Sequence, residues 1–556
     1  MKKIIIDNKI SFTLLFFLIS SLAAIYLTEL NGHIWSFLMI NNDGRFHVMR
    51  IEGLYQALKH GNLFPVVNMS FMDGFGYISN IFYANLWLYP VAFLRLIGLS
   101  TSQAFISFYV ILNFCTFVTS FGAYYYVSHR YDKSLLFSFL YTLSGYRIYD
   151  MVRRFDIGEL LTLVFLPIVI LGIYEIFYRD ASKWLILVAG MVAVIYSHAL
   201  SPILIAIFIC WVILFRIKAL IQQPKRILAL IYAGLTSLIL CLAYFLPVIE
   251  QLHHTQFKLT NSPLIDVSQA GMNLHDLLFW NVNNDLYNTN LGIVTLLTAI
   301  LVPLTIWKIK NPAVRDFALI GEILLFMTTD IFPWKYFVKT PLNTIQFPWR
   351  FNMIITIVMA LYLVNNDWNW FNKNWQKGLL IFFVIGLTVT GEQKLVVNHP
   401  EEYNSYKAFD QLDDYSIGGG EEYLPKGASL EELTNAPHVP RVEHGFAEIT
   451  NFKQQGSKLN LNFHNAKQAK IVLPVIGYYG YSAKDSTGKV SKLTMDYSKN
   501  GLATVVVNGS GVVRVNYYAT SIQKISRAFS ILSFLALIVG IFLRKKIKNR
   551  VSLNLK

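Results

Sequence analysis

The sequence opens with the apolar run ISFTLLFFLISSLAAIYLTEL, from Ile10 to Leu30, and the polar segment NNDGRFH follows from Asn41 to His47. A membrane-spanning helix needs about 20 apolar residues, so the run is long enough to cross a bilayer. Lysines precede it at positions 2, 3 and 9, and basic residues favour the cytoplasmic side of a membrane. The run is therefore predicted to cross outward, which places Asp43 at the outer surface.

The composition supports a membrane protein. Of the 556 residues, 54% are hydrophobic and only 15% are charged, whereas soluble domains carry about 25% charged residues. The net charge of +15 lies mainly in short links between apolar runs, as expected of cytoplasmic loops, so we expect no nucleic-acid partner. The three cysteines all fall in apolar runs, which excludes a disulfide framework and a CxxC metal site.

Residues 81–98 are apolar enough to cross, but the charge pattern argues against it. If they crossed, the basic links at 129–133 and 179–183 would face outward. An interfacial segment leaves every later basic link in the cytoplasm, and its aromatic residues suit that position. The sequence thus predicts a multi-pass protein of the plasma (cell) membrane with both termini cytoplasmic.

The predicted fold is a polytopic α-helical membrane protein with about twelve transmembrane helices and an extracytoplasmic β-rich domain near the C-terminus. The spans are expected at 10–30, 104–127, 134–150, 159–178, 184–200, 202–217, 227–247, 290–308, 316–331, 349–365, 378–391 and 527–543.

Three domains follow from this pattern. Residues 1–391 form the transmembrane domain, in which 31–103 is a first outer loop with interfacial helices, including an amphipathic helix over 44–60. Residues 392–526 lie outside the cell. Residues 527–556 hold the last span and a basic cytoplasmic tail. Alternating apolar residues at 458–463, 470–473, 503–507 and 512–517 predict a sandwich-like β domain.

Charged residues gather in the first two outer loops. Asp43 lies in the first loop. The residues in or beside the second are Arg147, Arg153, Arg154, Asp156 and Glu159. Charge at membrane depth is costly unless the groups pair or line a wet cavity, so these residues are candidates for a site. Two structural alternatives stay open: Asp43 is a good helix N-cap, and the loop charges could anchor two helix ends.

Further candidates lie at other outer helix ends. Arg350, in QFPWRF (Gln346 to Phe351), is suited to bind a lipid phosphate with two parallel hydrogen bonds, or it could extend to lipid headgroups without a specific ligand. His198 could be a capped interfacial histidine or a substrate contact.

Six features are distinctive when taken in order along the chain: Asp43 with His47, GNLFP (61–65), RFDIGE (154–159), QFPWR (346–350), EYLP (422–425) and GYYGY (477–481). Together they resemble the bacterial membrane proteins called YfhO-like or 6-pyruvoyl-tetrahydropterin-synthase-related, and the architecture resembles the GT-C fold of membrane glycosyltransferases. The likeness spans nearly the whole chain.

The resemblance implies transfer of a sugar from a polyprenyl-phosphate donor to a cell-surface acceptor, such as teichoic acid or another wall glycan. Asp43 would match the general base, and Glu159 or Asp156 the acid of the second loop. Substrate and phosphate contacts would come from Arg153, Arg154, Arg350, His47 and His198. A lipid phosphate is already a good leaving group, so a divalent metal is compatible with the site but not required. The alternative is a transporter or flippase for a lipid-linked substrate, which should show repeated halves and broken spans.

Overall fold

The computed structural model describes residues 2–29, 43–260, 263–366, 371–399, 414–485, 490–491 and 493–554; Asn41 and Asn42 lie outside the described residues. The chain forms two compact units. The helical unit comprises Met1–Leu63, Asn85–Leu230 and Leu259–Glu422, and the sheet unit comprises Phe64–Ala84, Ile231–Lys258 and Tyr423–Lys556.

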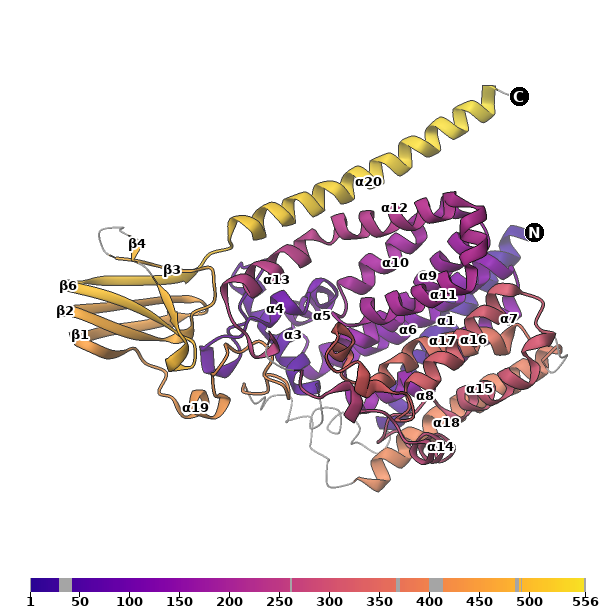
Figure 1. The fold of residues 1–556 in the computed structure, drawn as a ribbon, viewed down its shortest axis with the longest axis horizontal. Helices are drawn as coiled ribbons and strands as arrows, with labels where there is room; N and C mark the ends of the chain where they lie inside the picture. Colours follow the sequence, from indigo (N-terminus) through magenta and orange to yellow (C-terminus); the bar gives the residue numbers. More distant parts are fainter. Residues whose placement is uncertain are drawn as a thin grey trace. The chain divides into compact units, whose positions relative to one another are not determined.

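The helical unit is built around α9 (Ile157–Tyr178), the most enclosed of its long helices, with 78% of an apolar 18-residue stretch buried. It packs against α6 (Thr101–Ser128) and α10 (Leu185–Ile195) (Figure 1). The other α-helices of this unit are α1 (Lys2–Glu29), α3 (Gly44–Lys59), α5 (Tyr89–Leu96), α7 (Tyr131–Thr142), α8 (Gly145–Tyr149), α11 (Ser201–Gln222), α14 (Leu274–Val282), α15 (Ile293–Thr305), α16 (Pro312–Met327), α17 (Asn352–Val364) and α18 (Asn374–Asn398).

Fewer helices are long enough to cross a membrane than the sequence predicts. In the described part of the chain, five qualify by length and composition: α6, α9, α11, α18 and the Ser521–Arg544 part of α20 (Ser521–Asn554). A sixth arises if α12 (Pro224–Leu240) and α13 (Leu242–His254), bent by 67°, form one span. The number twelve was wrong because several apolar runs are interrupted. The run at 134–150, for example, stops at Thr142 and restarts as the short helix α8.

The amphipathic helix predicted over 44–60 is present as α3, but its buried face is wider than expected. His47 and Arg50 are buried together with the apolar side chains. The predicted interfacial segment at 81–98 is divided between α4 (Ser79–Phe82) in the sheet unit and α5 in the helical unit, both too short to cross a bilayer. The polar side chains His47 and Arg50 of α3 therefore face the protein interior rather than solvent.

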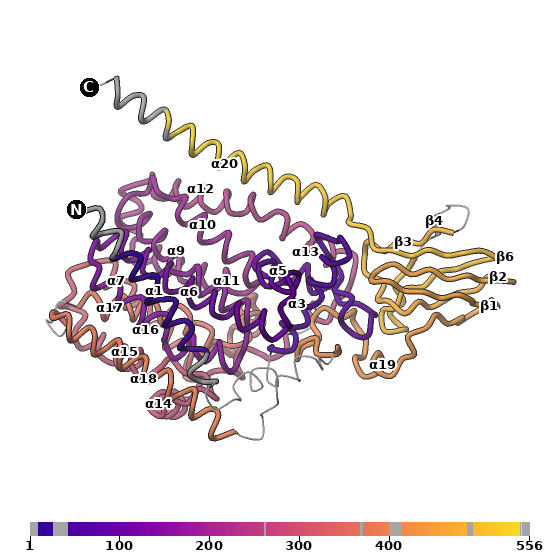
Figure 2. Tube along the Cα trace, turned by 180° about the vertical axis from the view of Figure 1, so that it is seen from behind, coloured from indigo at the N-terminus to yellow at the C-terminus, as the bar shows by residue number. Residues whose placement is uncertain are grey.

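The sheet unit contains the predicted C-terminal β structure as one antiparallel sheet rather than a sandwich. Its strands are β1 (Arg441–Gln455), β2 (Lys458–Ile476), β3 (Tyr481–Lys484), β4 (Val490–Ser491), β5 (Thr494–Asp496) and β6 (Leu502–Tyr517). The order is β1-β2-β6-β3-β4, with β5 also paired to β6, and the long strands lie side by side in Figures 1 and 2. Register shifts between Phe463 and Ala469 let β2 continue through two segments that the sequence pattern separates.

Candidate functional site

The site is organised by the chain just before α9. Residues Asp150–Arg154 form a π-helical turn, and Phe155 follows in the left-handed conformation with a φ of 62°. Such backbone is unfavourable for a bulky residue and persists only where surroundings hold it. The Phe155 ring stacks on Phe105 and Tyr109, with ring centres 5.0 and 5.2 Å away. This packing sets the direction from which Arg154 and Asp156 enter the site.

Arg154 binds three acids. Its Nη1 donates to Asp150 Oδ1 at 3.0 Å and to Glu159 Oε2 at 2.5 Å, and its Nη2 donates to Asp156 Oδ2 at 3.0 Å. The guanidinium also lies 4.9 Å from the centre of the Trp349 ring. All three acids are buried, at 0–1% exposure. Burial and the neighbouring Glu159 hold the pKa of Asp150 well above its usual range.

Asp156 is the N-cap of α9. Its Oδ1 accepts hydrogen bonds from the backbone N–H groups of Gly158 at 2.9 Å and Glu159 at 3.2 Å. Burial alone would raise the pKa of Asp156, but the positive charges of its neighbours, His198 first and Arg154 next, hold it well below the usual range. Asp156 is therefore ionised, and it serves as the fixed negative centre of the site.

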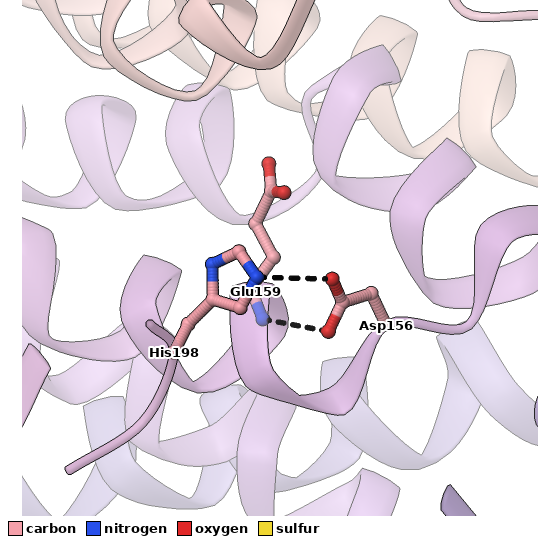
Figure 3. Close-up of side chains that lie close together, drawn as sticks. All are labelled: Asp156, Glu159 and His198. Atoms are coloured by element: carbon pink, nitrogen blue, oxygen red, sulfur yellow. Dashed lines mark hydrogen bonds and ion pairs between the residues drawn. The ribbon is translucent and has the colours of Figure 1, made fainter. Parts of the chain in front are cut away.

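Two histidines converge on Asp156. His47 Nε2 lies 3.4 Å from Oδ1, and His198 Nε2 lies 3.5 Å from Oδ2. Figure 3 shows the His198 ring facing Asp156. A Cβ on Gly158 would stand 3.1 Å from the Ser197 carbonyl and 3.2 Å from the His198 ring, so glycine permits this close approach.

Burial lowers the pKa of both histidines below the usual 6.5, and the charge of Asp156 opposes this shift. His47 Nδ1 lies 3.1 Å from Arg50 Nη1. Since arginine only donates, Nδ1 accepts and the ring proton is on Nε2, toward Asp156. His198 Nδ1 lies 2.7 Å from the Ser201 hydroxyl, which can either donate or accept.

Asp43 occupies the N-cap position of α3 without acting as a cap. Its side chain makes no capping hydrogen bond, and its carboxylate accepts none from any described residue. Its backbone N–H donates to the Arg154 carbonyl at 3.4 Å, which ties the two loops together. Burial and the charge of Asp156 raise the pKa of Asp43, while Arg154, His47 and Arg350 oppose the rise. The N-cap alternative is thus wrong, and the carboxylate is available to another group.

Arg350 supplies a second cation. It lies in the 3₁₀ turn Pro348–Phe351 at the start of α17, with 7% of its surface exposed. Nη1 donates to the Ile345 carbonyl at 2.8 Å, and the guanidinium lies 5.0 Å from the centre of the Phe347 ring. No acid among the described residues forms an ion pair with it, although it is near enough to lower the pKa of Asp43. It therefore has unused capacity to bind an anion.

The structure brings together Asp43, His47, Arg154, Asp156, Glu159 and His198, with Arg350 close by. Arg153 lies elsewhere: its guanidinium is 4.1 Å from the centre of the Tyr287 ring, and its Nε donates to the Tyr287 carbonyl at 3.3 Å. Sequence reasoning missed Asp150, whose spacing of four residues from Arg154 was a readable signal. It also missed Tyr146, whose hydroxyl donates to Glu159 Oε1 at 2.5 Å.

Asp156, Glu159 and His198 offer three metal-ligand atoms within 4.8 Å of one another (Figure 3). The carboxylate oxygens are already used, however. Asp156 accepts from the α9 backbone and Arg154, and Glu159 accepts from Tyr146 and Arg154. A divalent cation would have to displace the Arg154 guanidinium, which already carries the compensating charge. As arranged, these residues fit Arg154 and not a metal ion.

The site therefore combines an anchored network of acids, histidines and Arg154 with two groups that have spare capacity, the Asp43 carboxylate and the Arg350 guanidinium. The Asp43 carboxylate can accept a proton, and the Arg350 guanidinium can bind an anion.

Comparison with known proteins shows one similar chain over most of its length but assigns no activity. No protein-family model matches the chain. The chain is similar to a protein of Lactococcus lactis subsp. cremoris (strain MG1363), described as uncharacterized, with 25% identity over 587 aligned residues. The alignment covers 92% of each of the two chains, so the likeness extends through both units.

Proposed function

We propose that the protein is a membrane glycosyltransferase of the GT-C type, which moves a sugar from a polyprenyl-phosphate donor to a cell-surface glycan such as teichoic acid. The observation that carries this proposal is the Asp43 carboxylate, which is held beside a buried charge network yet accepts no hydrogen bond from a described residue. A general base needs this freedom, because it must accept a proton from the substrate.

In the proposed reaction, the acceptor hydroxyl attacks the anomeric carbon of the donor sugar while Asp43 takes the hydroxyl proton. The bond between the anomeric carbon and the phosphate oxygen breaks, and polyprenyl phosphate leaves with the bonding electrons. Arg350 binds the phosphate and stabilises its charge. Asp156 and Glu159 position Arg154 and the two histidines, since their oxygens are engaged within the protein.

The membrane location is supported by the long apolar helices. Only 11% of an apolar 18-residue stretch of α20 is buried, and its exposed side chains include Ile525, Leu532 and Phe542. In α18, Leu379, Phe382 and Phe383 are likewise exposed. Apolar helix surfaces of this extent fit a hydrocarbon environment. We place both termini in the cytoplasm, the site and residues 392–526 outside, and the protein in the plasma membrane.

The alternative, a transporter or flippase for a lipid-linked substrate, is favoured by the broken helix pair α12 and α13. Substrate sites at such breaks usually carry polar or charged groups, but the sequence from Thr236 to Pro247 has no charged residue. The described charge cluster lies instead at the N-terminal ends of α3 and α9.

Liposomes containing the purified protein test the two functions. With a labelled polyprenyl-phosphate sugar and a wall glycan outside, the transferase should release polyprenyl phosphate and label the glycan in equal amounts. Movement of intact donor across the bilayer, without release of lipid phosphate, would favour the transporter. A reporter fused after residue 100 should read outside the cell; a cytoplasmic reading would contradict the proposed topology.

A further inference from the structure

The helical unit contains an apolar cavity that the proposed reaction does not use. Its volume is about 270 Å³, and it lies among α6, α7, α9, α16 and α17. Its lining is mainly hydrocarbon and aromatic, including Val127, Phe137, Ile170, Phe317 and Leu361. Protein interiors are normally close-packed, with few voids larger than a water molecule, so a space of this size calls for an occupant.

The cavity and the candidate site lie toward opposite ends of the same helices. On α9, Asp156 caps the N-terminus, whereas the cavity is lined by Pro167, Ile170 and Tyr174. At a rise of 1.5 Å per residue, Tyr174 lies about 27 Å along the axis from Asp156. On α17, Arg350 precedes the first turn, and the lining residue Asn365 follows the last one. The nearest lining residue of α17 is Ile357, about 10 Å along the axis from Arg350, so a phosphate held by Arg350 lies beyond the end of the cavity opposite to Asn365.

The polar groups of the lining gather at that far end. Ser128 is the last residue of α6, Asn311 is the N-cap of α16, and Asn365 is the C-cap of α17. Several of them are bonded within the protein: the Tyr124 hydroxyl donates to Asn365 Oδ1 at 3.0 Å, and Asn311 Oδ1 accepts from the Ala313 N–H at 3.0 Å. The interior of the cavity thus suits a hydrocarbon, and the polar end suits a headgroup beside it.

We propose that this cavity binds one acyl chain of a bilayer lipid, with the headgroup at the end formed by Ser128, Asn311 and Asn365. The chemistry matches, because an apolar cavity in protein accepts apolar ligands. The polyprenyl donor is a poorer match, since its phosphate belongs beside Arg350 at the other end of the helices. The proposal rests on the membrane location of the protein, and the choice of a bilayer lipid over the polyprenyl donor rests on the proposed role of Arg350.

Filling the cavity provides the test. Ala123 and Val127 line it one turn apart on α6, so Ala123→Phe and Val127→Phe each place a ring inside. Gly122→Phe is the matched control, because a Cβ there meets no atom within 4 Å. Each protein is released from phospholipid nanodiscs and weighed by native mass spectrometry. The wild type and Gly122→Phe should retain a phospholipid, and the filling variants should retain about tenfold less.

Equal retention by the filling variants and the control would overturn the proposal, and so would a retained mass equal to polyprenyl phosphate. A second measurement uses the wild type alone and so does not depend on whether the variants fold. Titration with the fluorescent fatty acid cis-parinaric acid should saturate at one site per chain, and phospholipid should compete for it. Uptake that rises without saturation would also overturn the proposal.

Discussion

Replacing Arg154 by methionine should strongly destabilise the helical unit. The substitution keeps the length and much of the apolar stem of the side chain but removes the guanidinium that binds Asp150, Asp156 and Glu159. Asp156 is ionised and buried, so the change leaves a buried charge without its main cation. Arg153→Met is the matched control, because that guanidinium lies on the ring of Tyr287.

The magnitude follows from the cost of stranding buried charge. Removing one partner of a buried ion pair costs about 3–5 kcal/mol. The variant can instead protonate the carboxyl that has lost its partner, and for an ordinary pKa this costs about 4 kcal/mol at pH 7. The loss of unfolding free energy therefore stays within the same range. At pH 5 that protonation costs about 3 kcal/mol less, so the loss should shrink to about 1–2 kcal/mol. For Arg153→Met we expect about 1 kcal/mol at both pH values, the size of a cation–π contact.

Titration of Asp156 should change the free energy of unfolding of the wild type little between pH 7 and pH 5. A lowered folded pKa contributes stability that is present above the unfolded pKa, near 3.8, and is lost only as the pH falls through the folded pKa. The assay is unfolding in mixed dodecyl maltoside and dodecyl sulfate micelles, which reports the free energy of unfolding at each pH. A loss below about 1 kcal/mol at pH 7, or an equal loss at pH 5 and pH 7, would refute this reasoning.

Three further predictions concern binding and turnover. Arg350→Gln should weaken binding of polyprenyl phosphate by roughly 10- to 100-fold, measured by calorimetry, because a charge-assisted hydrogen bond contributes about 1.5–3 kcal/mol; unchanged affinity would exclude Arg350 from phosphate binding. Treatment with EDTA should leave the transfer rate unchanged, because Arg154 fills the place of a metal, and a rate restored only by added metal would count against that view. The pH profile of kcat/KM should rise with pH through the pKa of Asp43, which burial and Asp156 raise above 3.8, since only the ionised base accepts a proton; a rate that falls over this range would contradict the assignment.

Sequence patterns identified much of the site but not its internal connections. Arg154, Asp156 and Glu159 are close in the chain, and the charge of the loops predicts that Asp43 lies on the same side of a membrane as they do. The π-helical turn and the left-handed Phe155 left no sequence signal, so the binding of three acids by one arginine could not be foreseen. The meeting of His47 and His198 at Asp156 depends on tertiary packing alone.

The fold shows the same division. Long apolar runs predicted α6, α9, α11 and α18, but hydropathy does not reveal where a run is interrupted, so the number of spans was too high. In the sheet, β2 and β6 have one buried face and alternate clearly, whereas β1 is exposed along much of its length and shows no such alternation. A strand of that kind gives no periodic signal, and it was missed.

The most direct test of the account is Asp43→Asn. The substitution keeps the shape of the side chain and removes its basicity, and the carboxylate accepts no hydrogen bond from the described residues, so folding should be unaffected. Release of polyprenyl phosphate should fall by about 10²- to 10⁴-fold while the affinity for the donor stays the same. Release by the variant at the wild-type rate would contradict the central claim that Asp43 is the general base.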